Sequence, residues 1–288
     1  MTRPIPGAGM DRLTIIRQIE GFLQEDIGTG DITTEAIFPG NQMATAVFAA
    51  RSPLVACGFT MIVPLVFEVV DPAIRCRDNV PDGIIVQVGQ RLLVVQGPVA
   101  SLLLGERVAL NLAQRLCGIA TLTNRFVRAI DPLPVKIVDT RKTTPGLRVL
   151  EKYAVRAGGG GNHRFNLADG VLIKDNHIMA CGSIRQAVAA VRARAPHTLR
   201  IEVEAETLGQ VEECLEAGVD IVMLDNMDLD AMRQAVMRIG QRALVEASGG
   251  VTLENVRAIA ETGVDLISAG CLTHSAPACD IGMDMLAS

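Results

Sequence analysis

From residue 135 to the C-terminus, apolar and polar positions follow a unit that repeats along the chain. Each unit has a short run rich in β-branched residues, a polar residue that ends the run, and an amphipathic stretch with a period near 3.6 residues. Because strands that alternate with helices lie parallel in a sheet, the pattern predicts an α/β architecture. The predicted strands are residues 135–139, 170–175, 200–205, 219–225, 243–248 and 264–269, and the predicted helices include 183–195, 207–218, 227–240 and 252–263.

These units are too few for a complete barrel. An eight-unit α/β barrel usually takes roughly 250 residues, whereas the repeating region has about 140. We therefore expect residues 119–274 to form an incomplete α/β barrel of six or seven strands, and we expect this domain to carry the chemistry.

The N-terminal region has a different pattern. Short apolar runs separated by Gly, Pro and Asp turns predict a separate α+β domain over residues 1–118, and we expect the C-terminal segment 275–288 to pack back on it. Residues 101–129 are apolar nearly all round, apart from one polar stripe that includes Arg107. This stretch predicts a long helix that is buried between elements or between subunits.

The composition argues against a nucleic-acid-binding protein, a disulfide-rich protein and a membrane protein. A formal net charge of −5, no Trp and one Tyr give no basic face and no stacking surface for nucleic acid. Seven cysteines without a CxxC pair indicate reduced thiols rather than disulfides or structural zinc. The longest apolar stretch is too short and too interrupted to cross a membrane, and the opening MTRPIPGAGM is typical of a frayed tail rather than a signal peptide. We therefore expect a cytoplasmic protein.

Every predicted barrel strand ends in polar residues. Because the carboxyl ends of barrel strands meet at one mouth, where active sites lie, polar groups at all of them indicate a shared site. For any single strand the simpler interpretation is a solvated loop residue, but the whole set is harder to explain in that way. The residues at these ends are Asp139, Thr140, Arg141, Lys142, Lys174, Asp175, Asn176, Glu204, Asp225, Asn226, Ser248, Gly249, Gly250, Ser268, Ala269 and Gly270.

Lysine is confined to this part of the chain. Of 27 Lys and Arg residues, only Lys136, Lys142, Lys152 and Lys174 are lysines. Arg replaces Lys easily on a surface, but not where a compact ammonium group meets a phosphate or a reacting atom. Lys136 and Lys152 fit ordinary surface positions, so Lys142 and Lys174, at strand ends, are the better candidates for chemistry.

Arg141, His163 and Arg164 add donors that suit carboxylates, and residues 139–164 together hold six Lys and Arg, one His and two acids. At about 4 Å, two like charges repel by roughly 1 kcal/mol in water and by roughly 4 kcal/mol at an effective dielectric constant of about 20. Such a cluster needs an anion between its members. We therefore expect a polyanionic small-molecule substrate that has both carboxylate and phosphate groups.

Other strand-end residues suit a phosphorylated sugar. Glu204 and Asp225 could hold sugar hydroxyls and a divalent cation and stabilise positive charge at a sugar carbon, although salt bridges to the nearby cations are the simpler interpretation. The amides of Ser248–Gly250 and Ser268–Gly270 could bind a phosphate monoester, as the last two strand loops of such barrels often do. The glycines at 158–161 lack the surroundings of a dinucleotide fingerprint and are expected to give the backbone the freedom that places the residues after them.

Residues 139–178 form a long motif, DTRKTTPGLRVLEKYAVRAGGGGNHRFNLADGVLIKDNHI, and IEVE, VMLDN, EASGG and GVDLISAGCLTHS follow it. With these motifs the chain resembles the quinolinate phosphoribosyltransferase family, also called nicotinate-nucleotide pyrophosphorylase (carboxylating). The resemblance runs from EDIGTGDITTE near the start to the C-terminus, which is practically the whole chain.

The resemblance implies a pentosyltransferase of NAD synthesis. Such enzymes join quinolinate to 5-phosphoribosyl 1-diphosphate with magnesium, release diphosphate and carbon dioxide, and give nicotinate mononucleotide. The family fold is an N-terminal α/β sandwich with an incomplete α/β barrel, in homodimers, with hexamers as a further alternative. Each site of the homodimer includes an arginine from the partner, and Arg107 occupies the position of that arginine.

The resemblance also implies roles for individual residues. The catalytic groups would be two lysines that meet carboxylate or diphosphate oxygens and two acids that contact the ribose and the magnesium shell, directly or through water: Lys142, Lys174, Glu204 and Asp225. Quinolinate would be surrounded by Arg107, Thr140, Arg141, His163 and Arg164. The 5-phosphate would lie against the loops Ser248, Gly249, Gly250 and Ser268, Ala269, Gly270.

Three other functions stay open at this point. A relative of the family associated with molybdenum transport would act on another anion. A lyase would form a Schiff base through Lys174, because lysines in barrels can attack carbonyl groups. A sensor that binds a phosphorylated ligand without catalysis would leave Glu204 and Asp225 without a role.

Overall fold

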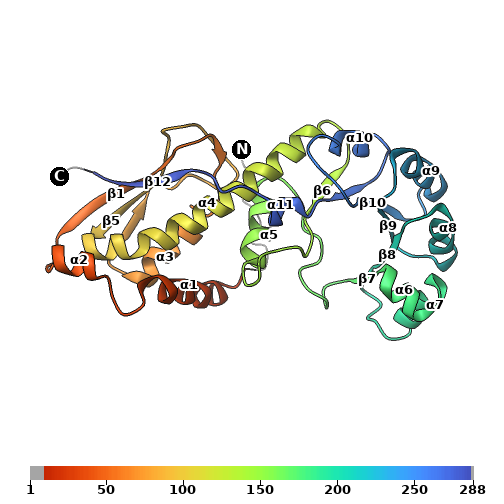
Figure 1. Ribbon diagram of the computed structural model, residues 1–288, viewed down its shortest axis with the longest axis horizontal. Helices are drawn as coiled ribbons and strands as arrows, with labels where there is room; N and C mark the ends of the chain where they lie inside the picture. The colour runs from red at the N-terminus through yellow and green to blue at the C-terminus, as the bar shows by residue number, and fades with distance from the viewer. Residues whose placement is uncertain (1–9, 287–288) are drawn as a thin grey trace. The chain divides into compact units, whose positions relative to one another are not determined.

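The computed structural model describes residues 10–286, which form two compact units (Figure 1). The first unit combines the chain up to Asn124 with residues 145–159 and the segment from Ala276, and the second combines residues 125–144 with residues 160–275. The boundary expected after residue 118 lies inside helix α4, Val99–Ala129, and residues 145–159 group with the first unit rather than with the barrel. The tail expected to fray lies outside the described residues, except for Met10.

The first unit is built on an antiparallel sheet with the strand order β12-β1-β5-β3. Phe48 on β1 meets Phe59 and Phe67 edge to face, with ring centroids 6.1 and 5.9 Å apart, an arrangement that stabilises an aromatic core. The elements of this unit are α1 (Arg12–Ile27), α2 (Ile32–Ile37), β1 (Met43–Ala50), β2 (Leu54–Val55), α3 (Ile62–Val70), β3 (Arg75–Arg77), β4 (Ile85–Val86), β5 (Arg91–Pro98), most of α4, α5 (Arg148–Ala157) and β12 (Ile281–Met285).

The C-terminal segment is part of the first unit. Strand β12 pairs with β1, and the side chain of Gln114 on α4 donates to the carbonyl of Ile281 at 2.9 Å. Helix α4 can approach this segment because Gly118 has no side chain, since a Cβ there would lie 2.0 Å from the carbonyl oxygen of Pro277. Across residues 10–286, α4 included, no helix combines the length and the apolar character that a bilayer crossing requires.

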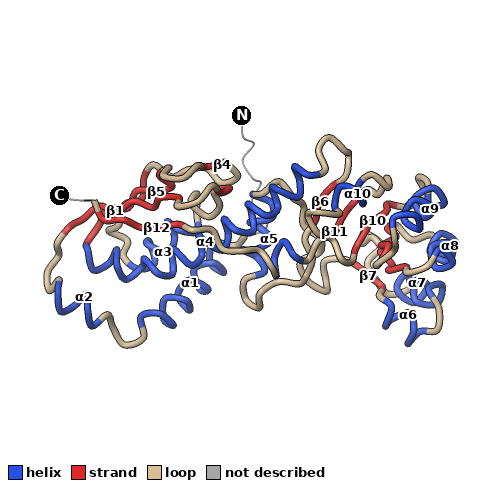
Figure 2. Tube along the Cα trace, turned by 45° about the horizontal axis from the view of Figure 1, so that its top comes forward, coloured by secondary structure: helices blue, strands red, loops and turns tan. Residues whose placement is uncertain are grey.

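The second unit is an open parallel sheet of six strands in the order β6-β11-β10-β9-β8-β7, which confirms the predicted incomplete α/β barrel. Helices follow the strands and lie on one side of the sheet (Figure 2). Next to β6, Gly161 makes an isolated parallel bridge with Val138. The strands are β6 (Lys136–Val138), β7 (Val171–Ile173), β8 (Ile201–Ala205), β9 (Ile221–Asp225), β10 (Leu244–Ser248) and β11 (Leu266–Ser268), and the helices are α6 (Asp175–Cys181), α7 (Ile184–Arg192), α8 (Leu208–Ala217), α9 (Leu229–Ile239), α10 (Val256–Ala260) and α11 (Cys271–His274).

The register of the parallel strands decides which side chains share a face of this sheet. Met223 on β9 is level with Glu204 on one side and with Glu246 on the other. Since side chains on a strand alternate between faces, one face carries Glu202, Glu204, Asp225, Glu246, Ser248 and Ser268, and we name it the polar face. The opposite face carries buried apolar residues that pack under the helices, among them Val203, Val222, Leu224, Val245, Ala247 and Ile267.

Two glycine substitutions test the packing of α4 against the C-terminal segment. Gly118→Ala should destabilise the protein by about 1 to 3 kcal/mol, because the new methyl group meets backbone atoms that cannot move aside easily. Gly21→Ala, in the interior of α1 with no atom within 4 Å of the new Cβ, should stabilise it by about 0.5 to 1 kcal/mol. Urea unfolding of both variants and the wild type measures the difference. A Gly118→Ala protein as stable as the Gly21→Ala control would contradict the close contact.

Candidate active site

The polar face brings together several residues that the sequence singled out. Glu204 and Asp225 lie on the neighbouring strands β8 and β9, and Ser248 on β10 is level with Asp225. Lys174 follows β7 with an extended backbone, and its Nζ lies 2.5 Å from Oε1 of Glu204. Glu204 therefore makes a salt bridge to a nearby cation, which was the simpler interpretation of this residue in the sequence.

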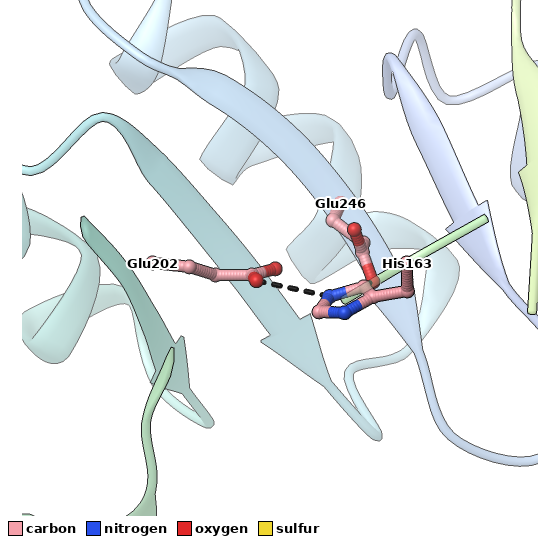
Figure 3. A group of neighbouring side chains, drawn as sticks. All are labelled: His163, Glu202 and Glu246. Atoms are coloured by element: carbon pink, nitrogen blue, oxygen red, sulfur yellow. Dashed lines mark ion pairs between the residues drawn. The ribbon is translucent and has the colours of Figure 1, made fainter. Parts of the chain in front are cut away.

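Deeper along the strands, the polar face carries two acids that the sequence analysis did not single out. Glu202 and Glu246 are 4% and 1% exposed, and the ring of His163 lies beside them (Figure 3). Nε2 of His163 is 3.0 Å from Oε2 of Glu202 and 3.7 Å from Oε1 of Glu246. The signal in the sequence was an acid inside an otherwise apolar run, because strands of a covered parallel sheet usually carry apolar side chains.

His163 is held at both ring nitrogens. Its Nδ1 accepts a hydrogen bond of 2.9 Å from the backbone N–H of Arg164, so the ring proton of the neutral imidazole lies on Nε2 and faces Glu202. Ligand atoms of His163, Glu202 and Glu246 lie within 4.8 Å of one another, a spacing that a metal site would also have. A nitrogen that carries a proton has no lone pair for a metal, however, so this geometry supports hydrogen bonding instead.

Glu246 is the acid whose ionisation the cluster changes most clearly. Burial raises the pKa of Glu246 to about 7, the neighbouring Glu202 adds to the rise, and His163 opposes it. Near neutral pH the two buried acids therefore carry less negative charge than two ionised carboxylates.

The segment that holds His163 is fastened beside β6. Asp139, fully buried at the end of β6, accepts from Nδ2 of Asn162 at 2.6 Å and from the backbone N–H of His163 at 2.9 Å. A Cβ on Gly161 would lie 3.1 Å from the Lys136 side chain and 3.2 Å from that of Val138, so the chain passes close to β6 at the end of the GGGG run. Asp139 thus orients the residues after this run rather than standing at the surface of a strand end.

The cations of the polar face have acids near them. Burial lowers the pKa of Arg164, as does the charge of Arg141, while Glu202 and Glu204 oppose the shift, so these four groups lie close enough to interact. Nη1 of Arg164 also donates to the carbonyl of Gly170 at 3.0 Å. The expectation that the cations need a ligand between them is therefore too strong, because buried carboxylates already offset part of their repulsion.

Lys142 lies alongside the loop after β11. Its carbonyl accepts from the Thr273 hydroxyl at 2.7 Å, and a Cβ on Gly270 would lie 2.9 Å from its side chain. In that loop Ser268 and Ala269 are 3% and 1% exposed, and the Ala269 N–H donates to the carbonyl of Val138 at 3.0 Å. Of the loop Ser268–Gly270, Gly270 is thus the residue that a ligand beside Lys142 could approach. Thr140 is also engaged locally, since its hydroxyl accepts from the Lys142 N–H at 3.0 Å.

The loop after β10 is shaped by glycine. Gly249 and Gly250 have φ angles of 94° and 58°, which L side chains rarely adopt. A Cβ on Gly249 would lie 2.2 Å from Oδ1 of Asn226, so the loops after β9 and β10 touch through backbone and a short amide side chain. Asn226 itself has a φ of 54°, and its N–H donates to the carbonyl of Ser248 at 3.0 Å. The two loops are therefore a single packed structure at the edge of the polar face.

Arg107 and Lys152 lie in the first unit, whereas Lys136 is level with Leu266 and so lies on the polar face, at the start of its strand. Arg107 is exposed on the part of α4 that belongs to the first unit, and Lys136 is exposed on β6 as expected. The surface position expected for Lys152 is wrong, because this residue is fully buried on α5 in the first unit. Its neighbour Glu151 is also buried and accepts from Nε of Arg115 at 2.8 Å.

In chemical terms, cations from the neighbouring loops lie next to the acids of the polar face, since Lys174 pairs with Glu204 and Arg164 interacts with Glu202 and Glu204. Arg141 and Arg164 offer planar guanidinium donors for carboxylates, and Lys142 and Lys174 offer ammonium groups for phosphate oxygens. The carboxylates of Glu204 and Asp225 could hold a hard divalent cation.

Comparisons with known proteins agree over the whole chain. Residues 31–117 match the family described as quinolinate phosphoribosyl transferase, N-terminal domain, and residues 119–284 match quinolinate phosphoribosyl transferase, C-terminal domain. Over 279 residues the chain is 48% identical to a protein of Bacillus subtilis (strain 168) named as a probable nicotinate-nucleotide pyrophosphorylase (carboxylating), with 97% of this chain and 96% of that protein covered.

Two further relatives are similar over nearly their whole length. A Mycobacterium leprae (strain TN) protein named nicotinate-nucleotide pyrophosphorylase (carboxylating) is 45% identical over 273 residues, which cover 93% of this chain and 95% of that protein. The crystal structure of nicotinate-nucleotide pyrophosphorylase from Ehrlichia chaffeensis superposes with a TM-score of 0.90 at 41% identity, over 96% of this chain and 100% of that chain.

Stability against pH tests the ionisation of Glu246. A carboxyl group whose pKa is raised in the folded protein, here from 4.5 to about 7, contributes stability that is present below the unfolded-state pKa and is lost as the pH rises through the folded-state pKa. Between about pH 4.5 and about pH 7, we therefore expect the wild type to lose about 3 kcal/mol of unfolding free energy relative to Glu246→Gln. Urea unfolding across this range measures the difference, with Glu206→Gln, at an exposed site directly after β8, as the control. A constant difference between wild type and Glu246→Gln would contradict the assignment.

Proposed function

The chain belongs to the quinolinate phosphoribosyltransferase family, and we propose from this premise that it joins quinolinate to 5-phosphoribosyl 1-diphosphate and releases diphosphate and carbon dioxide. The product is nicotinate mononucleotide, so the protein is a pentosyltransferase of NAD biosynthesis. The observation that carries this proposal is the polar face, where cations for two anionic substrates lie beside acids that suit a sugar and a metal.

The two substrates fit different parts of the site. The guanidinium groups of Arg141 and Arg164, which lie near each other, suit the adjacent carboxylates of quinolinate. Lys142 and Lys174 suit the diphosphate. The loop around Gly250 suits the 5-phosphate, because no atom lies within 4 Å of the Cβ position of Gly250. Thr140, His163 and the partner's Arg107 are the remaining groups that we propose around quinolinate.

Magnesium fits the acids of the site. Glu204 and Asp225 present hard oxygen donors from neighbouring strands on one face, so they would hold the ion, directly or through water. Bound there, magnesium would neutralise charge on the diphosphate. Because Glu204 also pairs with Lys174, this lysine is the group that moves from the acid to the diphosphate when the donor substrate binds.

The reaction needs charge stabilised at three places. As the pyridine nitrogen forms its bond to the anomeric carbon, the bond from that carbon to the diphosphate breaks, and Glu204 and Asp225 stabilise the positive charge that develops on the sugar. Lys142 and Lys174 stabilise the electron pair that leaves with the diphosphate. The pyridinium then accepts the electron pair of the breaking carbon–carbon bond as carbon dioxide departs, and a proton replaces the carboxyl group.

The other functions considered for this sequence are not favoured. A Schiff-base lyase needs a Lys174 amine that is free to attack a carbonyl group, whereas the Nζ of Lys174 lies 2.5 Å from Oε1 of Glu204. The sensor and the relative associated with molybdenum transport find no specific support in the geometry of the site. All seven cysteines are free thiols, and we propose a reducing, cytoplasmic setting on that ground.

Release of labelled carbon dioxide tests the activity. Carboxyl-labelled quinolinate should lose its label only when 5-phosphoribosyl 1-diphosphate and magnesium are both present. Lys142→Ala should lower kcat/KM by about 100-fold or more, because it removes charge next to the leaving group, whereas the exposed Lys136→Ala should stay within about threefold of wild type. No release by folded wild-type protein would refute the proposed function, and equal losses in both variants would refute the role of Lys142.

Mixed subunits test the proposed homodimer with shared sites. If the partner's Arg107 completes each site, a heterodimer of one Arg107→Ala and one Lys142→Ala subunit has one intact site and should regain about half of the wild-type activity per dimer. Co-expression with two affinity tags isolates such heterodimers. Activity no higher than that of the parent variants would count against sharing.

A further inference from the structure

A buried acid on β8 has no role in the mechanism above. Glu202 is the second residue of IEVEA, a strand whose residues are all buried, and it is only 4% exposed. Its register with Leu172 and Ile221 places an acid between apolar neighbours. Burial of such a group costs free energy unless a partner compensates it, so the contact that it makes is informative.

That contact pairs Glu202 with the ring of His163, and Glu246 lies beside both groups. Oε2 of Glu202 lies 3.0 Å from Nε2 of the ring, and within residues 10–286 its Oε1 has no hydrogen-bond partner. Because Nδ1 of the ring accepts from the Arg164 N–H at 2.9 Å, the proton between ring and acid belongs to Nε2. The hydrogen bonds thus run in one direction, from the Arg164 amide to the imidazole and from the imidazole to Glu202.

The hydrogen bond from the Arg164 amide to the His163 ring fixes the backbone of Arg164. His163 and Arg164 are adjacent, so a ring fixed by Glu202 also fixes the peptide group at which the Arg164 side chain begins. At its other end, the guanidinium group of Arg164 is held by the carbonyl of Gly170 at 3.0 Å. Arg164 is therefore anchored both at its backbone and at Nη1, and the first of these anchors depends on the tautomer that Glu202 selects.

We propose that Glu202 is a positioning residue for the quinolinate site: it holds the Nε2–H of His163, keeps Nδ1 turned to the Arg164 amide, and so aims Arg164 at a substrate carboxylate. Because both ring nitrogens of His163 are used inside the protein, we expect it to contribute to the quinolinate site through Arg164. The inference rests on the proposed function, since it takes quinolinate as the ligand of Arg164. It assigns no contact between Glu202 and either substrate.

Three variants test this role. Glu202→Ala removes the acceptor and should raise the KM for quinolinate about tenfold or more, while the KM for 5-phosphoribosyl 1-diphosphate stays within about threefold. Glu202→Gln keeps an oxygen that can accept from Nε2–H and should restore the quinolinate KM to within about threefold of wild type. Glu206→Ala, an exposed acid just after the same strand, is the matched control. An unchanged quinolinate KM in Glu202→Ala, an equal rise in both KM values, or a Glu202→Gln enzyme as impaired as Glu202→Ala would overturn the proposal.

A second measurement does not depend on activity. The chain has four histidines, so ¹⁵N-histidine labelling of the full-length wild type gives few ring signals, and the one missing in His163→Gln belongs to His163. We expect His163 to carry its proton on Nε2 and to have an unprotonated Nδ1. A proton on Nδ1 in the wild type would overturn the inference whatever the enzyme does, whereas wild-type protein that keeps this tautomer but releases no carbon dioxide would defeat only the proposed function.

Discussion

The parallel register of the six-stranded sheet is the constraint on which the site depends. Met223 is level with both Glu204 and Glu246, and the pleat then places Asp225 and Ser248 on the same face, one step closer to the strand ends. A slip of one residue in any of these strands would turn its polar side chains toward the helices and its apolar ones into the site. The hydrophobic contacts on the opposite face, which hold the register, therefore also assemble the chemistry.

The negative charge of buried acids in the site partly balances the positive charge of the cations at the strand ends. Cations stand at the strand ends, and buried acids lie beneath them, with Glu202 and Glu204 close enough to affect Arg164 and with Lys174 paired to Glu204. Such an arrangement lets the cations gather without a ligand and still attract anions, because carboxylates can be exchanged for substrate oxygens of the same charge. The electrostatics of this face therefore include attraction between cations and acids as well as repulsion among the cations.

The sequence pattern was sufficient for the fold and for much of the site. Each predicted barrel strand is present, because a β-branched run bounded by polar residues in an α/β chain almost always forms a buried strand. The family, the α/β architecture and the long helix ending at Ala129 are confirmed as well. The roles of individual site residues, magnesium and the homodimer remain predictions, since they depend on ligands and partner subunits.

What the sequence determined by itself was the order of the elements and the identity of the strand-end groups, since both follow from local periodicity and residue chemistry. Tertiary structure alone decided that Lys152 is buried, that residues 145–159 join the first unit, and that Glu202 and Glu246 meet His163. These outcomes depend on contacts between residues far apart in the chain. A periodic pattern shows that a side chain faces inward, but the groups that it meets there are set by the packing of other strands and loops.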